Sequence, residues 1–180
     1  MIRLLLRVAL LGAAIGWMLD RLLAWLAAGR APEPIHSMIV IDAPIERVWE
    51  TLAAVEDQPR WMHDMKAVRL LSTGTVGVGT RAEAEIRIFG VQVVDPITIT
   101  AFEPPRRFAI RHEGRFNGEG LIELESGIDG GTTIVRWHET IVPPSLPHLG
   151  ALLLAPILGR VFQADLGHLR ELVETAPAGS

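Results

Sequence analysis

The stretch Ile41-Asp42-Ala43-Pro44-Ile45-Glu46-Arg47-Val48-Trp49-Glu50 carries the chain from a strand into a helix. The residues that lead into it, 36–42, read HSMIVID and predict a strand. Pro44 suits the first turn of a helix, because its fixed φ angle and missing N–H cost nothing there. Apolar residues then recur at helical spacing, at Ile45, Val48, Trp49 and Leu52. We therefore expect one face of this helix to lie on a core.

A short helical turn over 56–61 follows, and the chain then becomes strand-like. Alternation is cleanest in residues 80–89, where alanine and isoleucine share one face and charged residues share the other. Asp129-Gly130-Gly131 lies between the last two apolar segments and indicates a hairpin, so we expect an antiparallel sheet. The predicted strands are 65–72, 80–89, 91–102, 108–113, 116–125 and 132–142.

The hydrophobic period changes near the C-terminus, where apolar residues recur at helical spacing over about 147–174. This stripe includes Leu152, Leu153, Leu166 and Leu169. A sheet with one apolar face needs a cover, and this helix is the only predicted element long enough to supply it. The expected fold class is α+β: a curved antiparallel β-sheet wrapped around a long C-terminal helix, with an N-terminal hydrophobic helix.

Residues 1–28 form that N-terminal helix, and the run 8–28 is long enough to cross a hydrocarbon core of about 30 Å. A span that ends at Leu19 costs less, because the charged pair Asp20-Arg21 then reaches the interface. We favour a single-pass membrane anchor. A cleaved signal peptide, which would leave a secreted or periplasmic protein, and an amphipathic helix that packs on the domain or on a partner stay open.

Two smaller features accompany this leader. Gly12 and Gly16 have the spacing that lets two helices approach closely, so a homo-oligomer formed through these glycines is a further prediction. Residues 29–35 contain two closely spaced prolines and predict an extended linker. The folded domain is expected over 36–176.

Composition excludes several classes of function. The formal net charge is -4, with 17 basic and 21 acidic residues, which gives no basic surface for nucleic acid. The chain has no cysteine, so disulfides and thiolate chemistry are excluded. The six histidines lack the spacing of a helical zinc site, and no phosphate loop or serine nucleophile motif is present. We expect no metal and no cofactor.

The opening stretch and the following Pro59-Arg60-Trp61-Met62 resemble the start of the START-like (SRPBCC) superfamily, including its polyketide cyclase/dehydrase and coenzyme-Q-binding groups. Further matches follow in the same order, at Val78-Gly79-Thr80-Arg81, at residues 103–108 and at residues 130–137. The likeness covers about 36–174. It implies the helix-grip fold, with a hydrophobic tunnel between the sheet and the C-terminal helix. It implies no particular chemistry, because the superfamily hosts carriers, receptors, cyclases and regulators on one scaffold.

Strand alternation predicts which side chains face this tunnel. Phe108 and Ile110 carry His112 to the inner face, and Trp137 carries Glu139 with it. Trp61 and His63 are expected at the mouth. The predicted ligand-binding residues are Trp61, His63, Ala82, Ala84, Ile86, Phe108, Ile110, Val135 and Trp137.

These features favour the binding of a lipid, quinone or other apolar small molecule at a membrane surface over catalysis. The alternative is a cyclase- or dehydratase-like enzyme that uses His112 and Glu139 as an acid–base pair. With one strand between theirs, the two residues are expected about 10 Å apart, which suits two ends of one ligand better than a direct pair. A third possibility is a protein-interaction role, in which the leader pairs with a second copy and the domain regulates a partner.

Overall fold

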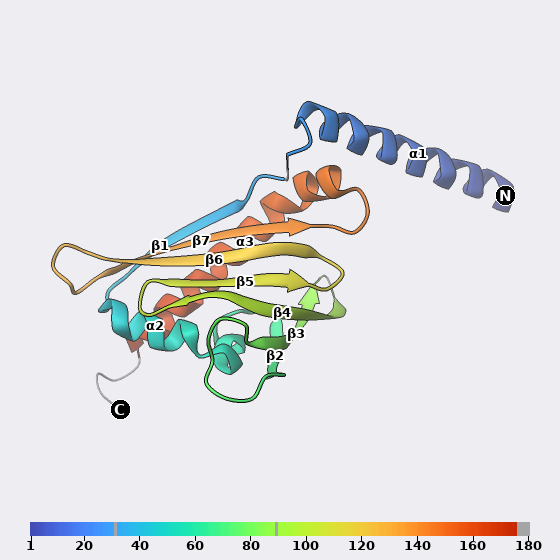
Figure 1. The fold of residues 1–180 in the computed structure, drawn as a ribbon. Helices are drawn as coiled ribbons and strands as arrows, with labels where there is room; N and C mark the ends of the chain where they lie inside the picture. Colours follow the sequence, from blue (N-terminus) through green and yellow to red (C-terminus); the bar gives the residue numbers. More distant parts are fainter. Residues whose placement is uncertain (31, 89, 176–180) are drawn as a thin grey trace.

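The computed structural model describes residues 1–30, 32–88 and 90–175 (Figure 1). Residue 31 of the predicted linker, residue 89 at the end of a predicted strand and residue 176 at the predicted domain end lie outside this range. The helices are α1 (Ile2–Leu26), α2 (Ile45–Ala53), the short 3-10 helix η1 (Val55–Arg60) and α3 (Pro147–Thr175). The strands are β1 (Ile35–Ile41), β2 (Met65–Leu70), β3 (Arg81–Ile88), β4 (Val91–Glu103), β5 (Arg107–Glu113), β6 (Asn117–Ser126) and β7 (Thr133–Val142).

All seven strands form one antiparallel sheet in the order β1-β7-β6-β5-β4-β3-β2. The first strand of the domain therefore pairs with the last, and the remaining strands follow as successive hairpins. The sheet curves over α3, which lies along one of its faces (Figure 1). The predicted α+β helix-grip fold is confirmed.

The core lies between the sheet, α2 and the second half of α3. The predicted apolar stripe of α2 is buried, because this helix closes the end of the curved sheet (Figure 1). In α3, Leu166 and Leu169 are buried as predicted. Leu152 and Leu153, predicted on the same stripe, are instead 61% and 62% exposed. In that half of α3 the inward face is formed by Ala151, Leu154, Ala155 and Leu158, which leaves the two leucines on the opposite face.

Helix α1 extends away from the sheet and touches the domain near its own C-terminal end (Figure 1). There Asp20 is only 5% exposed. Its Oδ1 accepts hydrogen bonds from the backbone N–H groups of His148 at 2.8 Å and Leu149 at 2.9 Å. N–H groups in the first turn of a helix have no partner within the helix. The carboxylate of Asp20 thus caps α3 from another helix, a role that the sequence did not indicate.

By length and composition, two helices in the described part of the chain could cross a membrane, α1 and α3. The best 18-residue window of α1 has a mean hydropathy of 1.8 and no buried residue. The corresponding window of α3 has a mean hydropathy of 1.4 and is partly buried, since α3 packs on β1, β7 and α2. The apolar character of α3 therefore has an explanation within the domain, whereas that of α1 does not.

Candidate functional site

A pocket lies between the inner face of the sheet and α3, with a cavity of about 120 Å³. Its walls come from η1, strands β2 to β7 and the middle of α3. The apolar lining residues are Met62, Met65, Ala84, Ile86, Ile97, Phe108, Ile110, Ile122, Trp137, Ile141, Leu158, Val161 and Phe162. The sheet wraps around the helix without closing on it, and the pocket occupies the space that remains.

Most of the predicted ligand-binding residues line this pocket: Ala84, Ile86, Phe108, Ile110 and Trp137. The others lie elsewhere. Ala82 and Val135 point to the same side of the sheet but are buried in the core. Trp61, expected at the mouth, is buried and packs edge-on against Trp137, with ring centroids 6.1 Å apart. His63 is exposed, and only its backbone N–H reaches toward the site.

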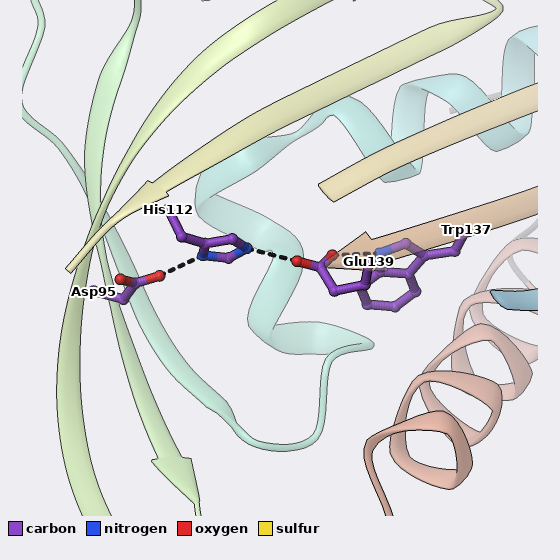
Figure 2. A network of polar contacts seen from close by, with 4 residues as sticks. All are labelled: Asp95, His112, Trp137 and Glu139. Atoms are coloured by element: carbon purple, nitrogen blue, oxygen red, sulfur yellow. Dashed lines mark hydrogen bonds and ion pairs between the residues drawn. The ribbon is translucent and has the colours of Figure 1, made fainter. Parts of the chain in front are cut away.

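Four side chains that line the pocket form a chain of hydrogen bonds (Figure 2). His112 lies between two carboxylates, with Nδ1 2.5 Å from Asp95 Oδ2 and Nε2 2.7 Å from Glu139 Oε1. The indole Nε1 of Trp137 donates to Glu139 Oε2 at 2.8 Å. All four residues line the pocket. The predicted inward orientation of His112 and Glu139 is therefore confirmed.

The expected separation of about 10 Å between these two side chains is wrong. Strand β6 does lie between their strands, and it places Gly118 opposite His112 and Gly120 opposite Glu139. Because glycine has no side chain, His112 and Glu139 lean across β6 and meet above it. A Cβ atom at Gly120 would lie only 2.6 Å from Glu139 Oε2. Gly120 thus makes the contact possible.

Asp95 is a member of this cluster that the sequence interpretation missed. It shares the inner face of β4 with Ile97 and Ile99, so strand alternation is the signal that could have found it. Pro96 obscures that signal, because proline interrupts the usual strand pattern. Asp95 is 6% exposed, and its second oxygen, Oδ1, has no hydrogen-bond partner in the described part of the chain.

The surroundings of His112 raise its pKa and so favour its protonated form. Burial alone lowers the pKa of His112, but hydrogen bonds to Asp95 and Glu139, together with their negative charges, raise it to about 10. Ionised carboxylates only accept hydrogen bonds, so both ring nitrogens must carry hydrogens to satisfy the two contacts. With a pKa raised to about 10, His112 is an imidazolium at neutral pH.

A third buried carboxyl, that of Asp165, lies on the helix side of the pocket. Asp165 of α3 is 3% exposed and accepts the backbone N–H of His63 at 2.9 Å. Burial raises the pKa of Asp165 above its ordinary value, although this hydrogen bond acts in the opposite direction. The sequence interpretation missed this residue too. Its signal is its position on the apolar stripe, between Phe162 and Leu169.

The chemistry that this site can support is limited by its composition. Among the described residues that line the pocket, His112 is the only side chain with a basic group, and neither lysine nor arginine is present. No group of three or more metal-ligating side chains with suitable geometry is found in the described ranges. The site is thus an apolar cavity with a compact acidic cluster built around one imidazolium.

The model of the family described as "Polyketide cyclase / dehydrase and lipid transport" matches residues 35–174. Comparison with curated proteins gives no match.

Solved structures share this fold at low sequence identity. A START superfamily protein from Mycobacterium smegmatis has a TM-score of 0.66 at 13% identity, covering 79% of this chain and 97% of that one. The Zhui aromatase/cyclase from Streptomyces sp. R1128 has a TM-score of 0.64 at 17% identity, covering 78% and 93%. A conserved protein from Geobacillus kaustophilus has a TM-score of 0.61 at 16% identity, covering 77% and 93%. At these identities the likeness establishes the fold.

Proposed function

Because the chain belongs to the polyketide cyclase / dehydrase and lipid transport family, in the START-like superfamily, we propose that it binds an apolar small molecule or lipid at a membrane surface. The observation that carries this proposal is the pocket between the sheet and α3. Its walls are mainly aliphatic and aromatic, and its hydrogen-bonded polar cluster is built from a few side chains. Such a lining favours apolar ligands, and a few placed polar groups orient them.

The volume of the cavity limits the size of the ligand. A cavity of about 120 Å³ is comparable to the engineered apolar cavity of ~150 Å³ that binds benzene. A ring-sized group, or a short segment of an acyl chain, is what this space takes without rearrangement. A longer molecule would have to extend beyond the pocket.

Helix α1 supports a location at the membrane. It is long and apolar enough to span, and the side chains before Asp20 are mostly exposed to solvent in the isolated chain. Exposed apolar surface of this extent is costly in water and is typical of a membrane-contacting segment. Because Asp20 is bonded to the start of α3, a bilayer around the preceding residues would hold the pocket close to its surface.

Ligand recovery tests the binding role. The full chain is purified in lipid nanodiscs, and bound molecules are extracted and identified by mass spectrometry against empty nanodiscs. Ala84→Phe fills the pocket from β3, whereas Ala67→Phe adds the same ring at an exposed site on β2. We expect the wild type and Ala67→Phe to retain an apolar molecule and Ala84→Phe to lose it. Equal recovery from both variants would contradict binding in this pocket.

Flotation tests the membrane role. We expect the full chain to float with liposomes in a density gradient and to stay with them at alkaline pH, which removes peripheral proteins. A chain that sediments free of lipid in both conditions would contradict the proposed anchor.

A second candidate function is proton-transfer catalysis of the cyclase or dehydratase kind. The observation that favours it is the direct contact of His112 with Glu139 at 2.7 Å. Both ring nitrogens are engaged, so the imidazolium would act as the acid and the Glu139 carboxylate as the base that removes a proton from carbon. Catalysed hydrogen–deuterium exchange at the methyl group of acetophenone tests this function. Exchange that His112→Gln abolishes would support it, and a rate equal to that of buffer would contradict it.

A further inference from the structure

The charges around the pocket are mostly of one sign. Four carboxyl side chains line it, those of Asp64, Asp95, Glu139 and Asp165, while His112 is the only basic side chain in the described lining. In an apolar cavity, charges interact more strongly than in water because little solvent screens them. A ligand that carries a negative charge would therefore meet net repulsion without any lysine or arginine to offset it.

The hydrogen-bonding groups of the cluster are also unbalanced, because all its donors are used and some of its acceptors are not. Both N–H groups of His112 and the indole N–H of Trp137 already donate to carboxylate oxygens. The acceptors have capacity left. Each Glu139 oxygen takes one hydrogen bond although it can take two. Asp95 Oδ1 has no partner in the described part of the chain, but it is fully buried beside Gly114 and does not face the cavity. What the cluster lacks is a donor.

We propose that the pocket selects an uncharged apolar molecule whose polar end is a hydroxyl, and that it discriminates against ligands ending in a carboxylate or a phosphate. The hydroxyl hydrogen is donated to a carboxylate of the Asp95–His112–Glu139 cluster. This inference rests on the proposed binding function and specifies the ligand class. A hydroxyl brings one donor for the remaining acceptor capacity of Glu139, whereas an ammonium brings three donors and leaves some of them unsatisfied in the apolar cavity.

A panel of ring-sized probes that differ only in the polar group tests this. Toluene has none, p-cresol has a hydroxyl, p-methylanisole has an ether that cannot donate, and p-toluate has a carboxylate. Dissociation constants are measured by equilibrium dialysis of the full chain in nanodiscs, with empty nanodiscs to correct for partition into lipid. We expect p-cresol to bind roughly tenfold tighter than p-methylanisole, since hydrogen bonds to charged acceptors are the stronger kind. We expect p-toluate to bind more weakly than toluene.

Two variants assign the preference to the cluster. Asp95→Asn removes one negative charge and an acceptor oxygen, so the advantage of p-cresol over p-methylanisole should shrink and the binding of p-toluate should improve. Glu119→Gln removes a carboxylate on an exposed side chain of β6, away from the pocket, and should change neither ratio. Benzylamine is added to the panel because tighter binding of this cation than of p-cresol would overturn the choice of a hydroxyl.

The outcomes separate this inference from the proposed function. If toluene binds but p-cresol gains nothing over p-methylanisole, or p-toluate binds as well as p-cresol, the ligand class is wrong and apolar binding stands. If no probe binds, the proposed binding function fails for ligands of this size, and the inference fails with it. The comparison within the wild type is sufficient even where Asp95→Asn does not fold.

Discussion

His112 Nε2 and Glu139 Oε1 lie 2.7 Å apart although β6 runs between the strands that carry them. The contact depends on Gly120, whose missing side chain leaves the space that the Glu139 carboxylate occupies. Neighbouring strands are about 4.8 Å apart, so two residues separated by an intervening strand rarely bond directly. Here a glycine in the middle strand determines the geometry of the polar cluster.

Gly120→Ala is therefore expected to separate His112 from Glu139. A methyl group there would lie 2.6 Å from Glu139 Oε2, and we expect a loss of about 1–3 kcal/mol in the free energy of unfolding from this overpacking. Urea unfolding measures the loss, and the NMR titration of His112 reports the broken contact as a lower pKa. Gly77→Ala is the control, because nothing lies within 4 Å of a Cβ at that position. An unchanged His112 pKa in Gly120→Ala would contradict the role of this glycine.

Stability is expected to fall with rising pH because the pKa of His112 is raised from 6.5 to about 10 in the folded state. Between these values the folded protein holds a proton that the unfolded chain has released. The contribution, a few kcal/mol at most, is full below about pH 6.5 and is lost as pH rises through about 10. Urea midpoints measured across this window should decrease steadily.

The amino-acid composition makes the pH dependence of stability easier to assign to His112. The chain has no tyrosine or cysteine, and Lys66 is its only lysine, so few other side chains titrate in the same window. His168→Asn, at an exposed histidine, should show the same decrease as the wild type. A urea midpoint that stays constant from neutral pH to about pH 10 would rule out the protonated His112.

Asp20→Ala is expected to free the first turn of α3. The carboxylate accepts two backbone N–H bonds, and losing a cap of this kind costs about 0.5–2 kcal/mol. Amide hydrogen exchange at His148 and Leu149 should accelerate, because their N–H groups lose their acceptor. Asp20→Asn keeps a carbonyl oxygen and should retain part of the protection. Exchange that is the same in the wild type and Asp20→Ala would show that this contact does not persist in solution.

Trp137→Phe is expected to remove a donor from Glu139 while keeping an aromatic ring next to Phe162. A buried carboxylate oxygen that loses its partner costs about 1–3 kcal/mol, which urea unfolding can measure. In a Glu139→Gln background the same substitution should lower the free energy of unfolding by a smaller amount, because a neutral amide oxygen forms a weaker hydrogen bond than a carboxylate. Equal losses in both backgrounds would mean that only packing, not the hydrogen bond, is affected.

Much of the fold could be predicted from the sequence because its signals are local. Alternation along β5 and β7 placed His112 and Glu139 on the inner face, since apolar neighbours on each strand fix the direction. The contact between them could not be predicted in this way. It depends on which strand lies between theirs and on the register that brings Gly120 opposite Glu139, and periodicity within one strand carries neither.

Helices α1 and α3 also show that local sequence signals do not indicate long-range contacts. The charges of Asp20 and Arg21 suggested a membrane boundary, but the partners of Asp20 lie on α3, 128 residues away from it in sequence at the nearest. Leu152 and Leu153 fit a helical stripe, yet the face of α3 near Glu33 and Ile35 is formed by Ala151, Leu154, Ala155 and Leu158 instead. Hydrophobic spacing indicates that a face is buried somewhere along a helix, and tertiary packing decides where.

The contact between α1 and α3 also sets an order of assembly. Asp20 is synthesised well before His148 and Leu149, which follow it by 128 and 129 residues. Closing a loop of this length is unfavourable until the intervening sheet has folded and brought its ends together. We therefore expect this contact to form last. Until the start of α3 is in place, the Asp20 carboxylate stays exposed to solvent beside the apolar side chains of α1.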